Sequence, residues 1–272
     1  MDAVGAKTIR DFGAQWTRYT ENVGYYASLE GFADIVGPLI PVEAFQGARV
    51  ADIGSGTGRI VNMLAEAGAG SILAVEPSAA VEVLRRNTRH LEHVEILQAP
   101  GDQLPPNGDL DFVVSLGVVH HIPEPDPVMR AAYAALRPGG KVVLWLYGAE
   151  GNELYLDVVR PLRLVTPRLP DPLLIALCWG LTPSLSLYAS LAKRLPLPLK
   201  DYMRGHIAKL SPSLRMLTIY DQLNPAYAKY YRREEALDLL ARAGFTDLAI
   251  HHRRGYSWTV VGTRPEEPSS PD

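Results

Sequence analysis

The chain has 272 residues, 47% hydrophobic side chains and a net charge of −3 at pH 7, which suits one elaborated α/β domain with a sizeable core. This slight acidity provides no general attraction to nucleic acid, so no nucleic-acid partner is expected. A single cysteine, Cys178, excludes an internal disulfide, and early charges at Asp2 and Lys7 argue against a signal peptide, so we expect a cytoplasmic protein.

The segment before the first strand, residues 8–46, mixes aromatic side chains with small and charged ones. This composition predicts a helical N-terminal extension. The aromatic side chains either pack on the core or face a ligand, and the sequence leaves both readings open.

Residues 49–53 form a short apolar run that predicts a buried strand, and the chain then reads Asp-Ile-Gly-Ser-Gly-Thr-Gly from Asp52 to Gly58. Glycines at every second position let the backbone approach a ligand where side chains would collide. Arg59 stands where a dinucleotide-binding loop carries its last glycine, so a pyrophosphate loop fits poorly. The motif resembles that of the class I S-adenosylmethionine (SAM)-dependent methyltransferases, which implies SAM as the cofactor and a Rossmann-like fold.

Residues 71–75 predict a second parallel strand, and Glu76 follows at its carboxyl end. A carboxylate there can accept hydrogen bonds from both ribose hydroxyls of a nucleoside. NAD enzymes carry an acid at a similar distance, and Glu76 before Pro77 also suits a solvated helix start. Glu76 therefore supports a nucleoside site only together with Asp52 and the glycines.

The third strand is expected at residues 94–97, and many related enzymes follow it with Gly-Asp-Ala, whose acid binds the adenine amino group. Here positions 99–101 read Ala-Pro-Gly, and the acid is displaced to Asp102. Either Asp102 serves in a reshaped loop, or Gln98 and the backbone recognise adenine. The resemblance assigns cofactor contacts to the glycine loop and to the following strand ends: Asp52, Gly54, Ser55, Gly56, Gly58, Glu76, Pro77, Gly101, Asp102 and Leu116.

After a fourth strand at residues 111–115, the chain reads Gly-Val-Val-His-His from Gly117 to His121. This resembles a signature of small-molecule and quinone methyltransferases. One histidine could accept a proton near neutral pH while the other bonds locally, and His120 is the favoured one to face the cofactor. The Asn-Pro-Pro-Tyr motif of enzymes that methylate DNA adenine is absent here, which disfavours such substrates.

A Leu-Arg-Pro-Gly-Gly sequence at residues 136–140 is expected to end a helix before a fifth strand at 141–146. Related enzymes open toward substrate after this strand, so the resemblance gives Tyr147 a catalytic role and Asn152 a substrate contact. Further substrate contacts are implied in the extension, at the return from the following insertion and near the C-terminus: Trp16, Tyr19, Tyr26, Tyr220 and Tyr256.

Residues 149–227 exceed the minimal fold and are expected to form two or three helices that act as a lid. The stretch 173–192 carries no charge, but Gly180, Pro183 and its serines argue against a membrane span. Three roles stay open: an apolar substrate pocket, a dimer interface, or a membrane contact through residues 173–200. The sequence is compatible with a monomer or a homodimer.

Residues 232–243 predict a helix, and 246–252 and 258–263 predict a hairpin that supplies the sixth and seventh strands, the seventh antiparallel. If the sixth strand is parallel to the first five, the hairpin turn lies beside the glycine loop. Arg254 and Trp258 would then border the active site with Tyr256.

We therefore predict a doubly wound α/β domain over residues 1–264 with a seven-stranded, mainly parallel sheet. Its parts are an N-terminal extension, a cofactor-binding core, a helical lid insertion after strand five and a closing helix and hairpin, with a disordered tail: residues 8–46, 47–148, 149–227, 228–264 and 265–272.

The function implied by the resemblance is methyl transfer from SAM to a small, partly apolar or glycosylated metabolite, with oxygen favoured as the accepting atom. The alternatives are a lipid or quinone methyltransferase at a membrane surface and a non-catalytic SAM-binding regulatory protein. No group of His, Cys, Asp or Glu has metal-ligand spacing, so no metal is expected.

Overall fold

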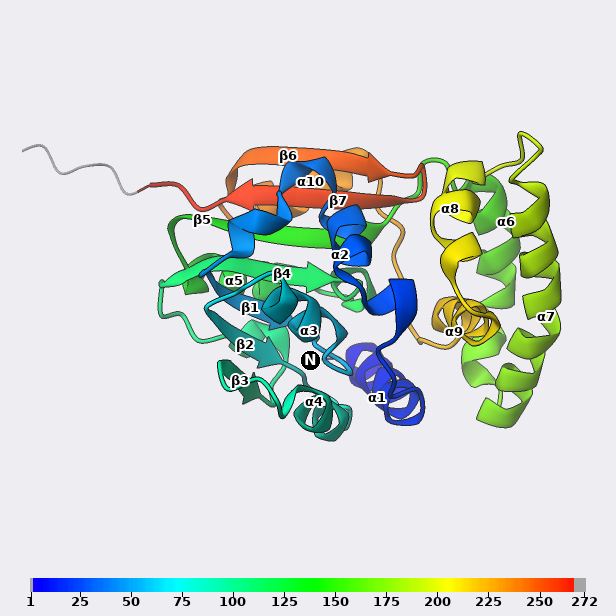
Figure 1. The fold of residues 1–272 in the computed structure, drawn as a ribbon, viewed down its shortest axis with the longest axis horizontal. Helices are drawn as coiled ribbons and strands as arrows, with labels where there is room; N and C mark the ends of the chain where they lie inside the picture. Colours follow the sequence, from blue (N-terminus) through cyan, green and yellow to red (C-terminus); the bar gives the residue numbers. More distant parts are fainter. Residues whose placement is uncertain (1, 267–272) are drawn as a thin grey trace, which may run out of the picture.

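The computed structural model describes residues 2–266, and its seven-stranded sheet has the order β3-β2-β1-β4-β5-β7-β6 (Figure 1). β7 pairs antiparallel with both of its neighbours, so β6 runs parallel to the other five strands. The doubly wound, mainly parallel sheet expected from the sequence is thereby confirmed. The strands are β1 (Arg49–Ile53), β2 (Ser71–Val75), β3 (Val94–Leu97), β4 (Leu110–Leu116), β5 (Leu136–Tyr147), β6 (Thr246–Arg253) and β7 (Ser257–Thr263).

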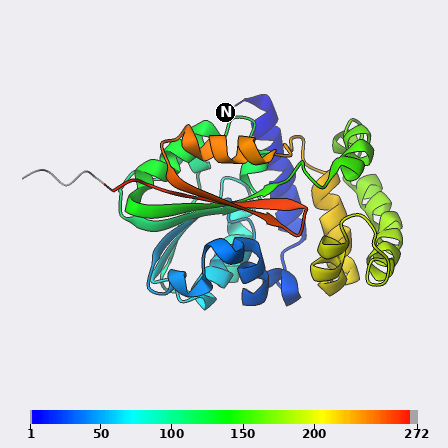
Figure 2. The ribbon, with the colours of Figure 1, turned by 90° about the horizontal axis from the view of Figure 1, so that it is seen from above.

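Helices cover both faces of this sheet, and four more follow β5 as the lid (Figures 1 and 2). One hydrophobic cluster joins the sheet to α5 and α10, and a second joins it to α2 and α3. The helices are α1 (Ala3–Arg18), α2 (Leu29–Val36), α3 (Arg59–Glu66), α4 (Val81–Thr88), α5 (Asp126–Ala135), α6 (Glu153–Leu162), α7 (Asp171–Leu191), α8 (Lys200–Gly205), α9 (Pro212–Leu223) and α10 (Arg233–Ala241).

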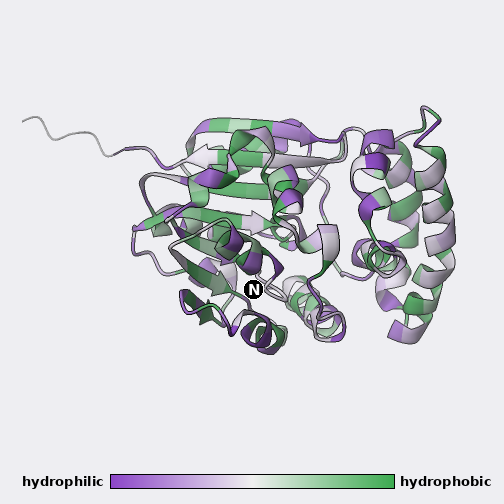
Figure 3. Cartoon of the chain, viewed as in Figure 1, coloured by the Kyte–Doolittle hydropathy of each residue, from purple (hydrophilic) through white to green (hydrophobic). Residues whose placement is uncertain are grey.

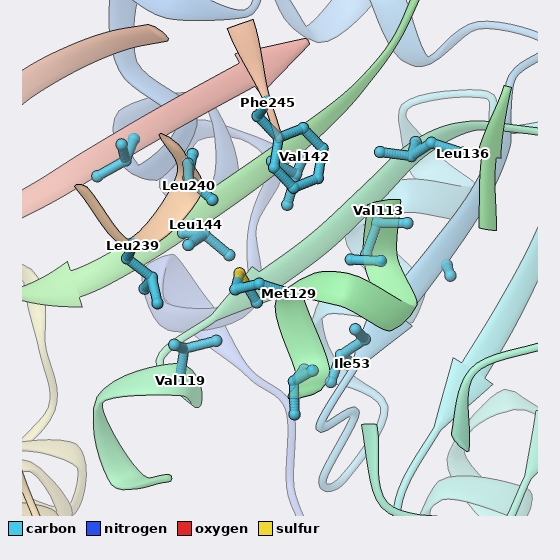
Figure 4. Close-up of a cluster of buried hydrophobic side chains, with 14 of the residues drawn as sticks. Ile53, Val113, Val119, Met129, Leu136, Val142, Leu144, Leu239, Leu240 and Phe245 are labelled. Carbon is cyan, nitrogen blue, oxygen red and sulfur yellow. The ribbon is translucent and has the colours of Figure 1, made fainter. Parts of the chain in front are cut away.

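The core on the α5 and α10 face shows why these elements dock as they do (Figure 4). Met129 of α5 and Leu239 and Leu240 of α10 face Val142 and Leu144 of β5, and all five are buried. Burying each such side chain contributes about 1.5–3 kcal/mol of transfer free energy. This packing fixes the strands and therefore the edge at which their carboxyl ends meet.

Three segments depart from the sequence expectation. α1 begins at Ala3 rather than near residue 8, because the Asp2 carboxylate accepts a hydrogen bond of 2.7 Å from the Gly5 N–H and caps the helix. β5 starts at Leu136, so the Pro-Gly-Gly sequence lies inside an irregular extended segment instead of a separate turn. The lid has four helices instead of two or three, since prolines at 196, 198 and 212 divide its second half.

The tail expected to be disordered begins at Pro265, and its last six residues lie outside the described part of the chain.

The glycine loop after β1 requires glycine at its first turn. Gly54 has a φ of 79°, and a Cβ there would lie 2.5 Å from the Val118 side chain. We expect Gly54→Ala to lower the free energy of unfolding by roughly 1–3 kcal/mol, as measured by urea unfolding. Gly180→Ala is the control, because a Cβ in the middle of α7 meets nothing within 4 Å and should stabilise the helix by about 0.5–1 kcal/mol. If Gly54→Ala unfolded with the same free energy as the wild type, a side chain at this position would not be strained.

Candidate active site

A cavity of about 470 Å³ lies at the carboxyl edge of the sheet, enclosed by α1 and by the inner side of the lid. Loops after β1, β2, β3 and β4 form its floor, and β5 contributes Trp145 and Tyr147 to one wall. Ligands of open parallel sheets bind at this edge, because the loops diverge there. The cavity volume falls in the range of small-molecule sites, about 300–1,000 Å³.

Gly54, Ser55 and Gly56 line one end of this cavity together with Glu76 and Pro77. The Glu76 carboxylate is 95% buried, and its oxygens accept hydrogen bonds from the Gly56 N–H at 2.8 Å and the Ser78 N–H at 2.9 Å. These bonds hold the carboxylate beside the glycine loop. Each oxygen keeps a second lone pair that can accept a ligand hydroxyl.

Gly101, Asp102 and Leu116 also line the cavity, at the ends of the third and fourth strands. A Cβ on Gly101 would lie 2.6 Å from the Ile53 side chain, so the loop packs closely on β1. Asp102 follows Gly101 in this loop and lines the cavity, although the acid of related enzymes stands earlier in the sequence. This placement keeps Asp102 as the residue expected to meet adenine.

Two residues assigned to the cofactor do not reach the cavity wall. Asp52 is buried behind the loop, where its Oδ2 finds no hydrogen-bond partner within residues 2–266, and burial raises the pKa of its carboxyl to about 7. Gly58 begins α3 with a left-handed backbone and packs against Thr88 and Leu84. Both residues shape the loop from behind the cavity wall.

The two histidines exchange the roles expected from the sequence. His121 lines the cavity, whereas His120 is fully buried behind it, with its ring 3.8 Å from the ring of Tyr147 and 5.9 Å from that of Trp145. The preference for His120 was wrong because the 3₁₀ helix η5 (Val119–His121) turns consecutive side chains in different directions.

His121 presents one free nitrogen. Its Nδ1 lies 2.8 Å from the Tyr227 carbonyl oxygen, which can only accept, so Nδ1 carries the proton. Nε2 is then a lone-pair acceptor, and it has no partner among residues 2–266. Burial lowers the pKa of His121 to about 4, which keeps the imidazole neutral at pH 7.

Tyr147 and Asp221 form the polar centre of the cavity. The Tyr147 hydroxyl donates to Asp221 Oδ2 at 3.0 Å, and the buried Gln15 side chain donates to Asp221 Oδ1 at 2.9 Å. Burial, and next the nearby Asp221 charge, raise the pKa of Tyr147 well above its usual value, so its hydroxyl stays protonated. The arrangement joins α1, β5 and α9 around one carboxylate.

Three of the expected substrate contacts lie elsewhere. Tyr19 and Tyr220 pack edge to face, with ring centroids 5.8 Å apart, outside the cavity. Tyr220 precedes Asp221 on α9 and points about 100° away from it around the helix axis. Asn152 is buried and donates to the carbonyl oxygens of Gly148 and Tyr256, so it braces the backbone after β5.

Trp16, Tyr26 and Tyr256 line the cavity as expected, the last of them at the hairpin turn that borders this edge. Arg254 and Trp258, which were expected to border the active site beside Tyr256, make other contacts. Arg254 pairs with Asp34, and Trp258 packs on His252 with its Nε1 donating to the Tyr231 carbonyl oxygen. Neither side chain reaches the cavity.

Sequence reasoning missed one face of α1 and the inner face of the lid. The α1 residues recur at a spacing of three or four, a helical signal that was available in the sequence. The lid residues carried no such signal, because their inward direction depends on how α8 and α9 pack. The missed cavity-lining residues of these two faces are Gly5, Thr8, Ile9, Phe12, Tyr202, His206, Leu214, Leu217, Thr218 and Gln222.

The buried His121 makes stability depend on pH. Its pKa is about 4 in the folded chain and about 6.5 in the unfolded chain, so its contribution is complete above pH 6.5 and is lost as pH falls toward 4. At pH 5 this costs the wild type about 2 kcal/mol relative to pH 7. Urea unfolding measures this dependence. Between pH 7 and pH 5, the free energy of unfolding of His121→Gln should fall by about 2 kcal/mol less than that of the wild type. His90→Gln, at an exposed site, is the control, and an equal loss in wild type and His121→Gln would contradict the assignment.

Comparison with known proteins agrees with this geometry. The family of methyltransferase domains matches residues 51–144, which contain the glycine loop, Glu76 and the paired histidines. A tRNA U34 carboxymethyltransferase of Pseudoalteromonas translucida is 32% identical over 119 residues, 42% of this chain and 37% of the relative. A ubiquinone biosynthesis O-methyltransferase of Acinetobacter baumannii is 29% identical over 101 residues, 35% of this chain and 42% of the relative. The chain thus spans well under half of the length of these curated relatives.

Solved structures share the fold at low sequence identity. A SAM-dependent methyltransferase of Thermotoga maritima, described as a possible histamine N-methyltransferase, has a TM-score of 0.53 and 17% identity, over 93% of this chain and 98% of that one. Human N-acetylserotonin methyltransferase in complex with SAM also has a TM-score of 0.53, with 12% identity over 96% of this chain and 56% of that one. The family match identifies residues 51–144 as a methyltransferase domain, and the solved structures share the Rossmann-like fold of the chain around it.

Proposed function

We propose that the protein transfers the methyl group of SAM to a hydroxyl of a small, partly apolar or glycosylated acceptor. The observation that carries this proposal is the continuity of the cavity, which runs from the glycine loop and Glu76 to the polar centre at Tyr147 and Asp221. One end suits a nucleoside and the other suits a hydroxylated acceptor. A site of this shape can hold donor and acceptor in contact, which is what methyl transfer requires.

The residues present fit SAM. The backbone of Gly54 and Gly56 is open to the cavity, Glu76 offers lone pairs for ribose hydroxyls, and Asp102 offers a carboxylate for the adenine amino group. Bound SAM supplies an electrophilic methyl carbon whose bond to sulfur breaks, the electron pair remaining on sulfur. The half-buried aromatic wall of Trp16, Tyr26 and Trp145 would help to exclude water from this bond.

The polar centre can take the proton that the acceptor loses. As the acceptor oxygen bonds to the methyl carbon, its proton must pass to a base within hydrogen-bond reach. Asp221 is a carboxylate held by Tyr147 and Gln15, so it is oriented before an acceptor binds. We assign the proton to Asp221, and His121 Nε2 to a second hydrogen bond that positions the acceptor.

The acceptor class is inferred from the cavity wall. Tyr202 and Tyr256 stack with ring centroids 4.0 Å apart, and Leu214 and Leu217 of α9 add aliphatic surface. Such a wall favours a ring or an alkyl group beside the reacting hydroxyl. The chain's acidity supports a small-molecule acceptor over nucleic acid, although several curated relatives carry tRNA in their names.

An acceptor screen tests this proposal. Full-length protein and SAM would be incubated with phenols, quinols, glycosylated aglycones, aryl amines and unmodified tRNA, and S-adenosylhomocysteine would be quantified by mass spectrometry. The proposal expects turnover with a hydroxylated apolar acceptor and a product that gains one methyl group on oxygen. Turnover confined to amines or to tRNA would contradict the acceptor assignment, and SAM binding without any turnover would favour the regulatory alternative.

A further inference from the structure

The outer side of the lid exposes an unusual amount of apolar surface. Twelve of the fourteen large hydrophobic side chains that are exposed within residues 2–266 lie between Leu154 and Leu195. Leu154, Leu173 and Leu187 are exposed by 68%, 59% and 62%. Patches of this kind on a soluble domain mark contact sites, because isolated surface leucines are ordinary and clustered ones are not.

α7 is the centre of this surface and lies at the edge of the molecule farthest from the sheet (Figures 1 and 2). Leu174, Cys178 and Ala189 are buried on its inner side, and Leu173, Leu177 and other leucines remain exposed. Figure 3 shows this helix coloured mainly green and white along its length. α7 is long and apolar enough to cross a membrane by length and composition, yet it packs along α9, which lines the cavity.

The net charge around this surface is positive. From the start of α6 to Lys209, residues 153–209 contain eight basic and four acidic side chains, in a chain whose overall net charge is −3. Arg168 precedes α7, and Lys193 and Arg194 follow it, so cations flank both ends of the apolar helix. Within residues 153–209, the exposed basic residues that form no ion pair with any of residues 2–266 are Arg160, Arg168, Lys193, Arg194, Lys200 and Arg204.

This combination favours an anionic lipid surface as the occupant. Exposed leucines can enter the boundary between headgroups and acyl chains while the flanking lysine and arginine side chains reach the phosphates. A symmetric dimer through the same face would bring two positively charged surfaces together, which disfavours it. The charge complementarity therefore selects a bilayer over a second copy.

We propose that the outer face of α6 and α7, with its flanking basic residues, docks on an anionic lipid bilayer. Docking places the inner helix α9, and the cavity that it lines, one helix layer from the lipid. Because docking requires no methyl transfer, it is independent of the proposed function and is tested without any acceptor.

The test is flotation of the full chain with two kinds of vesicle, phosphatidylcholine alone and phosphatidylcholine mixed with phosphatidylglycerol. We expect the protein to float with the mixed vesicles, and to detach when about 1 M salt reduces the screening length to about 3 Å. Leu173→Ser combined with Leu187→Ser, and separately Lys193→Gln combined with Arg194→Gln, should each weaken partitioning about tenfold or more.

Matched controls separate docking from general surface effects. Val4→Ser with Val23→Ser changes the two large apolar side chains that are exposed outside the lid within residues 2–266, and Arg86→Gln with Arg89→Gln removes two exposed charges beside the sheet. Both control pairs should float like the wild type, and unchanged thermal unfolding should show that every variant is folded. The proposal is overturned if the protein does not float, if it floats equally with neutral vesicles, or if the lid pairs match their controls. Sedimentation as a dimer that the leucine pair dissociates would also overturn it, since the face would then bind a second copy.

Discussion

Replacing Asp221 by asparagine is expected to lower kcat by about 10²- to 10⁴-fold for a hydroxylated acceptor, which is the usual contribution of a positioned general base. The amide keeps the size of the carboxylate, and its single oxygen can still accept from the Tyr147 hydroxyl, which donates at 3.0 Å. Its NH2 group cannot accept the bond that Gln15 donates to Oδ1, so urea unfolding should confirm that the variant is folded. The amide cannot take a proton at neutral pH. Steady-state kinetics of methyl transfer would measure the loss.

Two further variants test whether the loss of kcat is specific to Asp221. Asp201→Asn, at an exposed position of the lid helix α8, should keep the wild-type kcat. His121→Gln should raise KM more than it lowers kcat, because His121 is assigned to positioning. SAM affinity should stay the same in all three variants. If Asp221→Asn retained wild-type kcat while His121→Gln lost it, the base would be His121 and our assignment would be reversed.

The second large effect is on cofactor affinity. Glu76→Gln should raise the Kd for SAM by about 10- to 100-fold, because hydrogen bonds to a charged group contribute about 1.5–3 kcal/mol. Glutamine keeps one carbonyl oxygen to accept from the Gly56 N–H of the glycine loop, whereas its NH2 group cannot accept the second bond, from the Ser78 N–H. Calorimetric titration would measure the change directly.

An exposed glutamate provides the control for this effect. Glu66→Gln, on the surface of α3, should bind SAM like the wild type. Urea unfolding of Glu76→Gln would separate lost affinity from lost stability. An unchanged Kd in a folded Glu76→Gln variant is incompatible with ribose recognition by this carboxylate.

The sheet could be predicted because its signals are local. β1, β2 and β3 were located to the residue, since each is a short apolar run bounded by turn residues, and Glu76 follows directly from where β2 ends. The spacing of glycines at every second position likewise predicted the tight turn of the glycine loop. The residues at the nucleoside end of the cavity could therefore be predicted from the sequence pattern, because ligands bind at the carboxyl edge of a parallel sheet.

The acceptor end could not be predicted in the same way. Whether His120 or His121 faces the cavity depends on one turn of a 3₁₀ helix, and whether Tyr220 or Asp221 does depends on the rotation of α9 about its axis. A rotation of one residue moves a side chain by about 100°, and only packing against α1 and β5 fixes it. Gln15 illustrates this, because its contact with Asp221 joins residues 206 positions apart.

The most direct test of the central claim is calorimetric titration of the full chain with SAM, S-adenosylhomocysteine and NAD. We predict that both sulfur nucleosides bind with a micromolar Kd, which corresponds to roughly −8 kcal/mol, and that NAD does not bind. Binding of NAD alone, or of none of the three, would contradict a SAM-dependent methyltransferase site at this edge of the sheet.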